Sequence, residues 1–179
     1  MATFEILPGL PPYGPAPEAF SATGQGKHSE GFVVRFMTKS GDVWVGNFQP
    51  GLGGCSIVFE HPNAVNVIVL SGGQGYVVDP DSRRCLNTFG ANINSAFKIS
   101  ELGEIVFGNG LWFEAIGRNG HVWRSDRISW DGIKDLVVDG LTLMGHAWDI
   151  SDQWMSFSLN LANGEFTGGS YSGPDRRGL

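Results

Sequence analysis

Short apolar runs separated by glycine, asparagine and aspartate turns fill the chain from Phe32 to Leu161. Residues 121–128 alternate between apolar and polar, whereas residues 64–70 are almost continuously apolar and β-branched. Alternation with period two is typical of a half-buried strand, and a continuous apolar run is typical of a strand buried on both faces. No stretch of ten or more residues keeps a helical period. The pattern therefore predicts an all-β fold.

The predicted strands begin at Phe32 and recur until the end of the apolar pattern. We expect them at residues 32–38, 42–48, 56–60, 64–70, 74–79, 84–89, 95–99, 104–107, 111–116, 121–128, 136–138, 141–148 and 153–161.

Four similar turns interrupt these strands at nearly regular spacing, namely Ser40-Gly41, Asp81-Ser82, Asn119-Gly120 and Asn163-Gly164, which are 41, 38 and 44 residues apart. Asn-Gly between apolar strands is a strong hairpin signal, because a type I′ turn needs positive φ at both central residues. Counting between successive turns gives about four strands each time. The sequence therefore predicts about four repeated antiparallel hairpin or meander units.

Four strands in a period of about 40 residues resemble the blades of β-propeller proteins. The resemblance covers residues 32–171 and rests on turn placement, strand count and aromatic positions, such as Val43-Trp44 and Val122-Trp123 after two of the turns. It implies a propeller-like architecture without indicating a particular family. A β-sandwich or a meandering barrel whose hairpins recur at similar spacing is the alternative.

The chain ends differ from this central pattern. Residues 8–17 hold five of the nine prolines, and proline cannot donate to a sheet ladder. We therefore expect residues 1–31 to form an extended Pro/Gly-rich arm, residues 32–171 a single β domain and residues 172–179 a tail. The arm is either a surface segment without a binding role or a peptide that a partner recognises.

The charge excludes one large class of partner. The formal net charge is −6 and no run of basic residues occurs, so nucleic acid is not the expected partner. An acidic surface suits solubility or a basic protein partner. No apolar stretch approaches the length of a membrane-spanning helix, and residues 1–12 lack the features of a signal peptide. We expect a soluble, cytoplasmic protein, either a monomer or a small homo-oligomer, with no membrane association.

Two cysteines, Cys55 and Cys85, lie 30 residues apart, and no Cys-x-x-Cys pair occurs. This density does not imply a disulfide scaffold, so two reduced thiols are expected, with a single disulfide as the alternative. No phosphate-binding loop, dinucleotide fingerprint or nucleophile elbow is present. The sequence therefore indicates no cofactor.

The richest polar stretch covers residues 124–132, Arg-Ser-Asp-Arg-Ile-Ser-Trp-Asp-Gly. Its candidate partner- or ligand-binding residues are Arg124, Asp126, Arg127, Trp130 and Asp131. Asp126 and Asp131 offer paired carboxylates for acid–base chemistry or an oxygen-ligated cation, and Trp130 offers an exposed ring for a sugar or a protein. The simpler interpretation is an exposed strand end with surface ion pairs, and we predict no metal site here.

A second polar group consists of His146, Asp149 and Asp152. Alternation along a strand would direct His146 and Asp149 to opposite faces, so a turn built around the Asp149 carboxylate is the simpler interpretation.

Three functions remain open at this point. The first is a non-enzymatic module that binds a protein partner, for which an inhibitor or immunity-type protein is an analogy. The second is a β protein that binds a carbohydrate or small molecule, and the third is a hydrolase that uses Asp126, Asp131 or His146. The first is the leading prediction.

Overall fold

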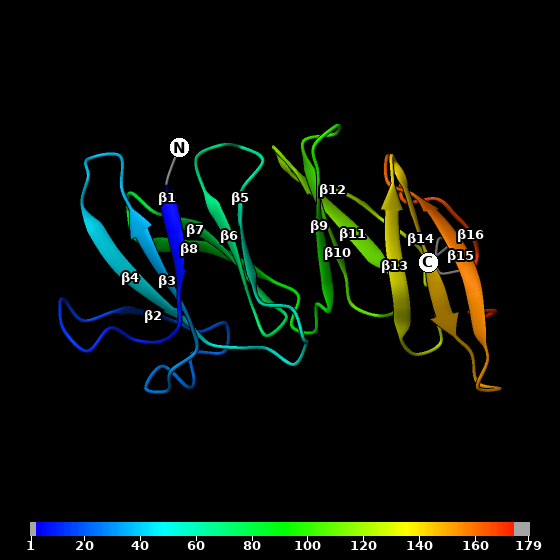
Figure 1. Ribbon diagram of the computed structural model, residues 1–179, viewed down its shortest axis with the longest axis horizontal. Helices are drawn as coiled ribbons and strands as arrows, with labels where there is room; N and C mark the ends of the chain where they lie inside the picture. The colour runs from blue at the N-terminus through cyan, green and yellow to red at the C-terminus, as the bar shows by residue number, and fades with distance from the viewer. Residues whose placement is uncertain (1–2, 174–179) are drawn as a thin grey trace. The chain divides into compact units, whose positions relative to one another are not determined.

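The computed structural model describes residues 3–173, which form strands, turns and irregular segments (Figure 1). The sixteen strands of this part make four four-stranded sheets. The all-β prediction is confirmed. The described residues include no helix of the length and hydropathy needed to cross a bilayer.

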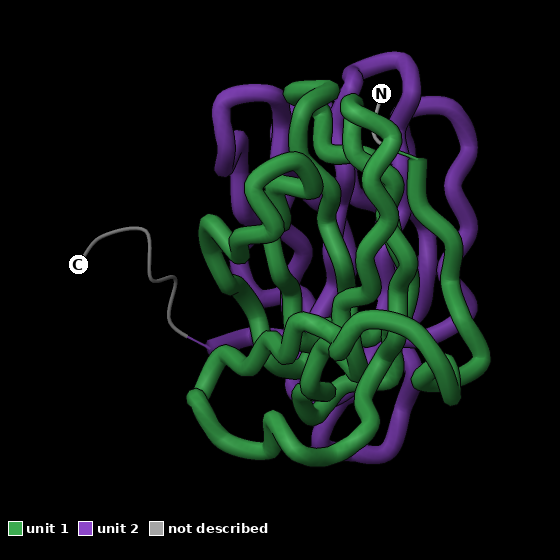
Figure 2. The backbone as a smooth tube through the Cα atoms, turned by 90° about the vertical axis from the view of Figure 1, so that its left-hand side faces the viewer, with its two compact units in different colours: residues 1–94 green, residues 95–179 purple. Residues whose placement is uncertain are grey.

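The chain divides into two compact units, Met1–Asn94 (unit 1) and Ser95–Leu179 (unit 2), coloured green and purple in Figure 2. Each unit contains two of the sheets.

Unit 1 holds one irregular sheet and one meander. The first sheet has the order β1-β3-β4-β2, with β1 Thr3–Leu7, β2 Glu18–Phe20, β3 Phe32–Met37 and β4 Val43–Phe48. The second has the order β5-β6-β7-β8, with β5 Ile57–Glu60, β6 Val67–Ser71, β7 Gln74–Asp79 and β8 Arg84–Phe89. The pairing of β2 with β4 is parallel, and the other pairings are antiparallel.

The core of unit 1 lies between the facing sides of these two sheets. Alternate residues of β3 and β4 point to this side, among them Phe36 and Trp44, whose rings stack 4.5 Å apart. From the second sheet, Val69 and Tyr76 pack into the same cluster. Strand β6 is buried along its whole length, as predicted, but the predicted strand at residues 64–70 is too long, because residues 64–66 form a turn in which Val65 is exposed.

Unit 2 contains two antiparallel meanders. The first has the order β12-β11-β10-β9, with β9 Ser95–Ile99, β10 Glu104–Gly108, β11 Phe113–Gly117 and β12 Gly120–Arg124. The second has the order β13-β14-β15-β16, with β13 Ile133–Asp139, β14 Thr142–Trp148, β15 Trp154–Asn160 and β16 Phe166–Gly168. Their facing sides enclose a core that includes Phe113, Trp123, Leu143 and Leu159.

Each of the four turns identified in the sequence joins the third and fourth strands, in chain order, of one sheet. The joined strands are β3–β4, β7–β8, β11–β12 and β15–β16. The repeated hairpins are confirmed, but the type I′ geometry is wrong. In the Gly-containing turns only Gly41, Gly120 and Gly164 have positive φ (91°, 106° and 75°). At the first turn Gly41 donates its amide to Thr38 at 3.0 Å, and a type I turn followed by a left-handed glycine has this pattern.

The prediction that strands begin at Phe32 is wrong. Within the predicted arm, β1 pairs with β3 along its full length and β2 pairs with β4. The proline-rich segment between them lies against the first sheet, where Pro11 and Pro15 line a pocket of about 280 Å³ together with Val45. Most of the predicted tail, residues 172–179, lies outside the described residues.

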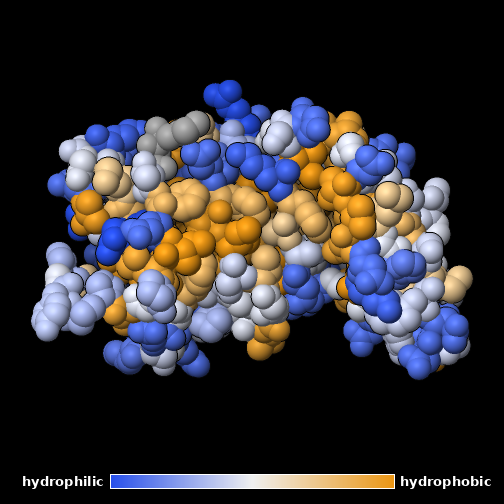
Figure 3. All heavy atoms as spheres, in the orientation of Figure 1, coloured by the Kyte–Doolittle hydropathy of each residue, from blue (hydrophilic) through white to orange (hydrophobic). Residues whose placement is uncertain are grey.

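Large apolar side chains reach the surface at several places, including the cross-strand neighbours Val137 and Met144 (Figure 3). The most exposed are Leu52 at 91%, Tyr13 at 90% and Ile150 at 74%, each in a separate loop. Isolated exposed apolar residues are ordinary on soluble domains, so they do not define a site. Successive four-stranded sheets are consistent with the propeller-like prediction, although they do not by themselves define a closed ring.

Candidate functional site

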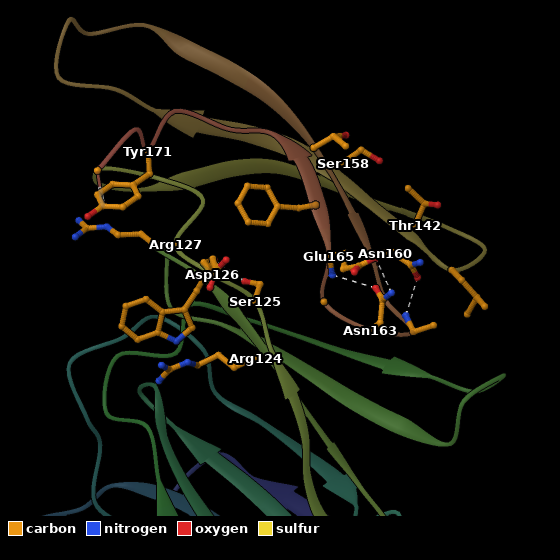
Figure 4. A pocket seen from close by; sticks show the side chains of 17 residues that line it. Arg124, Ser125, Asp126, Arg127, Thr142, Ser158, Asn160, Asn163, Glu165 and Tyr171 are labelled. Carbon is orange, nitrogen blue, oxygen red and sulfur yellow. Dashed lines mark hydrogen bonds between the residues drawn. The ribbon is translucent and has the colours of Figure 1, made fainter. Parts of the chain in front are cut away.

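A cleft of about 1380 Å³ opens in unit 2 beside the end of β12 (Figure 4). Five stretches of chain line it: the residue before β11, the end of β12 with the residues after it, the start of β14, the β15–β16 hairpin, and the segment after β16. The principal lining residues are Trp112, Arg124, Ser125, Asp126, Arg127, Asn160, Asn163, Glu165, Phe166 and Tyr171.

Two arginines at one end of the cleft lie over aromatic rings. The Arg124 guanidinium is 5.4 Å from the Trp112 ring centre, and that of Arg127 is 4.7 Å from the Tyr171 ring centre. Arg127 also donates from Nε to the Ser129 carbonyl at 2.8 Å and from Nη2 to the Trp130 carbonyl at 2.5 Å. These bonds fix its orientation, whereas Arg124 is exposed and held by its ring contact.

The residues after β12 are tightly anchored. Ser125 accepts the Phe113 amide on Oγ at 3.1 Å and donates that hydroxyl to the Asp126 carbonyl at 2.8 Å. Ile128 and Ser129 are completely buried. The polar stretch at residues 124–132 is therefore a packed connection between two sheets, and the expected exposed strand end describes only some of its side chains.

The opposite end of the cleft is an amide- and carboxylate-rich turn. Glu165 donates its amide to Asn163 Oδ1 at 3.0 Å, and Asn163 Nδ2 donates to the Glu165 carboxylate at 2.9 Å (Figure 4). Asn160 Oδ1 accepts the Ala162 amide at 2.9 Å. These bonds hold polar side chains in place around the turn, at the end of the cleft away from Arg127 and Tyr171.

The cleft continues around the β16 edge onto a second surface. Leu143 and Leu159 face the core of unit 2, and strand alternation directs Thr142, Ser158 and Thr167 to the other side of their sheet. Because these hydroxyl residues also line the cleft, it has an aromatic and charged part beside β12 and a hydroxyl-rich part beyond β16.

Three of the five residues predicted for a site line the cleft: Arg124, Asp126 and Arg127. Trp130 does not. It is half-buried, and its ring meets that of Tyr171 edge-on at 4.7 Å. Asp131 is exposed and also lies outside the cleft lining. The two carboxylates considered as a catalytic pair, Asp126 and Asp131, are thus not both at this cleft.

His146 and Asp149 have separate environments. His146 Nδ1 is 3.4 Å from Asp135 Oδ2. Asp149 Oδ1 accepts the amides of Ser151 at 2.8 Å and Gln153 at 3.0 Å, so the predicted carboxylate turn is present. The bond from the Gln153 amide, and then that from the Ser151 hydroxyl, lowers the pKa of Asp149 from its ordinary value. No three His, Cys, Asp or Glu side chains within residues 3–173 are placed to share a metal ion.

The thiols of Cys55 and Cys85 are free and half-buried, and burial raises the pKa of both.

Sequence reasoning missed several cleft residues, among them Trp112, Asn160, Glu165 and Tyr171. Each is distant in sequence from Arg127 or lies in a turn assigned only a scaffold role.

The fold and the cleft define a repeat-built all-β chain with a mixed aromatic, charged and amide binding surface. No family model matches the chain, and no curated protein matches it. Among solved structures, one titled "Crystal structure of the eukaryotic initiation factor" is similar at 8% identity and a TM-score of 0.41, covering 76% of this chain. The matched region spans 40% of that structure's chain, and similarity at this level defines neither a family nor a function.

Proposed function

We propose that the chain is a non-enzymatic binding module whose cleft in unit 2 receives a segment of a protein partner. The observation that carries this proposal is the pair of arginines, Arg124 and Arg127, that lie on aromatic rings at one end of a large open cleft. Arginine and aromatic side chains are enriched where binding energy concentrates in protein interfaces. Asp131 and His146, the other residues considered for a hydrolase, do not line the cleft.

Charge supports a partner with a basic surface. Residues 95–173 contain ten acidic and five basic side chains, although the cleft itself is balanced, with Arg124 and Arg127 against Asp126 and Glu165. The acidic surroundings would attract a basic protein over distance, while the cleft would select it at contact. An inhibitor or immunity-type protein has this combination by analogy, and we propose the cytoplasm as its location.

The test compares capture by the wild-type chain with capture by two charge-reversed variants. Arg124→Glu changes an exposed cleft residue, and Arg84→Glu changes an exposed arginine of β8 outside the cleft by the same charge. We expect a protein that the wild type and Arg84→Glu retain from native lysate, and that Arg124→Glu loses. Added salt should weaken its capture. Equal retention by all three chains would contradict a role for the cleft.

A carbohydrate is the second candidate, favoured by the amides of Asn160 and Asn163 and the hydroxyls of Thr142, Ser158 and Thr167 in one cleft. Trp112 also lines it and offers a ring for stacking. Titration of the protein with a glycan panel should then change its tryptophan fluorescence. An unchanged spectrum across the panel removes this candidate.

A further inference from the structure

One of the four repeated hairpin turns differs from the others in its left-handed residue. Three of the turns place a glycine at positive φ, namely Gly41, Gly120 and Gly164, whereas the β7–β8 turn places Arg83 there, at a φ of 57°. Glycine adopts this conformation without a steric penalty, and a residue with a side chain does not. A non-glycine residue held in this region is an observation from which a functional role can be inferred. Arg83 is therefore a candidate for a role beyond forming the turn.

This arginine lines the pocket of about 280 Å³ beside the proline-rich segment of unit 1. β2 runs parallel to β4 and pairs with residues 46–48, so the same register continued backwards would place residues 15–17 beside residues 43–45. Two of these three preceding residues are prolines, which have no amide N–H to donate to a neighbouring strand. The pairing therefore stops, and the pocket lies beside the unpaired part of β4, where Val43 and Val45 line it.

The walls of this pocket are largely apolar, and one side is open to solvent. Pro11 and Val45 line it, and Tyr13 lines it while its side chain stays 90% exposed. The proline-rich segment is fixed near its start by a bond from the Leu10 amide to the Glu30 carboxylate at 3.0 Å. Pockets for small molecules usually measure about 300–1,000 Å³, so this one suits a ligand of amino-acid size that has an apolar group.

Two side chains of opposite charge line the same pocket without a partner. Arg83 comes from the β7–β8 turn and Glu18 from the start of β2, and in the part of the chain that the structure describes neither side chain has a hydrogen bond or an ion pair. Arg35 lines the pocket as well, but its guanidinium bonds the Glu5 carboxylate at 2.7 Å. The pocket therefore offers one available guanidinium and one available carboxylate beside apolar walls.

We infer that this pocket binds a small apolar zwitterion, a free amino acid or a dipeptide, whose carboxylate pairs with Arg83 and whose ammonium group pairs with Glu18. The site lies in unit 1 and goes beyond the function proposed for the cleft of unit 2. A guanidinium can bind a carboxylate through two parallel hydrogen bonds, and the apolar group of the ligand would displace water from beside Val45. Ion pairs open to solvent are individually weak, so we expect a Kd of about 0.1–1 mM.

The experiment is a chemical-shift titration of the full chain, labelled with nitrogen-15, in slightly acidic buffer that keeps the ligand amines protonated. The probes are L-phenylalanine, 3-phenylpropanoate, which lacks the amine, and phenylalaninamide, which lacks the carboxylate. We expect L-phenylalanine to shift the amide signals of Tyr13, Val43 and Val45, and each of the other two probes to bind about 5-fold more weakly. The dipeptide leucyl-phenylalanine, titrated in parallel, distinguishes the two sources, because the tighter of it and L-phenylalanine has the spacing of charges that the pocket prefers.

Variants of the two charged residues separate ligand binding from folding. Arg83→Gly removes the guanidinium and relaxes the left-handed backbone, so it should unfold at the same temperature as wild type or higher, and it should bind L-phenylalanine no more tightly than phenylalaninamide. Glu18→Gln should likewise bind L-phenylalanine no more tightly than 3-phenylpropanoate. Arg84→Gln is the matched control, because Arg84 is an exposed arginine next in sequence that does not line the pocket, and it should keep the wild-type affinities.

Three results would overturn the inference. If neither L-phenylalanine nor the dipeptide shifts the signals of Tyr13, Val43 and Val45 at about 10 mM, the pocket does not bind apolar zwitterions. If wild type binds 3-phenylpropanoate or phenylalaninamide as tightly as L-phenylalanine, the assignment of the two charges is wrong. If Arg83→Gly unfolds at a lower temperature than wild type and keeps the full affinity for L-phenylalanine, the arginine serves the turn and not a ligand.

Discussion

Trp44 donates its indole N–H to the carbonyl of Pro80 at 2.9 Å, joining the β3–β4 hairpin of one sheet to the β7–β8 turn of the next. Both residues are buried. Trp123 makes the same bond to Leu161 in unit 2. Two of the repeated turns are therefore followed by a tryptophan, Trp44 or Trp123, whose indole hydrogen bond connects its sheet to a later turn in the same unit.

Replacing Trp44 or Trp123 by phenylalanine should destabilise the protein by about 2–4 kcal/mol, since each change leaves a buried carbonyl unpaired and opens a cavity. The free energy of unfolding in urea measures this. Trp154→Phe is the matched control, because Trp154 is 39% exposed and contacts Lys134 at the surface, and it should change stability by less than about 1 kcal/mol. Equal effects from the buried and exposed tryptophans would contradict the role of the indole bond.

Three loops of unit 1, at residues 50–54, 71–74 and 90–94, contact one another through their backbones at glycine positions. A Cβ on Gly53 would lie 2.3 Å from the Ile93 carbonyl oxygen, whereas one on the adjacent Gly54 would meet nothing closer than Asn94 Oδ1 at 3.9 Å. Gly53→Ala should therefore cost about 2–3 kcal/mol, and Gly54→Ala should be neutral or slightly stabilising. Thermal unfolding of the two variants checks this, and a loss of stability in Gly54→Ala like that in Gly53→Ala would show that the difference in space is irrelevant.

Strand positions could be predicted where turn residues bound an apolar run on both sides. The runs at residues 74–79, 84–89 and 95–99 coincide with β7, β8 and β9. Strands β1 and β2 could not, because they are short, flank a proline-rich stretch whose local preference opposes a sheet, and are held by pairing with β3 and β4. Tertiary pairing there overrides local propensity.

The candidate site was predictable only in part. Arg124, Asp126 and Arg127 were found because polar residues cluster on a short stretch, and all three line the cleft. Trp130 was expected at the surface because its sequence neighbours are polar, yet the chain after β16 returns to Ile128 and places Tyr171 against the Trp130 ring. The contact of Trp130 with Tyr171 could not be predicted, because the two residues are about 40 positions apart and local sequence patterns do not report such contacts.

The Asp149 turn should make part of the stability depend on pH. Its folded pKa is lowered, chiefly by the Gln153 amide and next by the Ser151 hydroxyl, so its contribution is complete above the ordinary value of 3.8 and is lost as pH falls through the lower folded value. We expect Asp149→Asn to be less stable than wild type at neutral pH and the difference to vanish in acid. Urea unfolding across this range measures it, and a difference independent of pH would exclude the carboxylate. Ser151→Ala, which removes one bond and keeps the amide bonds, should show a smaller effect.

Replacing each of the two cleft arginines by lysine should change the free energy of unfolding by different amounts. Arg127 uses two nitrogens to bind the carbonyls of Ser129 and Trp130, a fork that an ammonium group cannot reproduce. Arg127→Lys should cost about 1–2 kcal/mol of unfolding free energy, and Arg124→Lys, which keeps a cation near Trp112, less than about 0.5 kcal/mol. Chemical denaturation followed by tryptophan fluorescence measures both. If Arg124→Lys is the more damaging change, the fork is not what orders the connection after β12.

Phe20 is the side chain that anchors β2 on β4, so its removal should release β2. Its ring stacks on Phe48 and lies 6.1 Å from the Trp44 ring, and it is the one large apolar side chain of β2. Phe20→Ala should cost about 2–3 kcal/mol, less than a fully buried phenylalanine because Phe20 is only half-buried. With β2 released, the Gln49 amide loses its bond to the Phe20 carbonyl and should exchange its hydrogen faster, while the Ser125 amide in unit 2, bonded to Phe113, should not change. Hydrogen exchange resolved by residue tests this directly, and an unchanged Gln49 rate would mean that backbone pairing holds β2 in place without its aromatic ring.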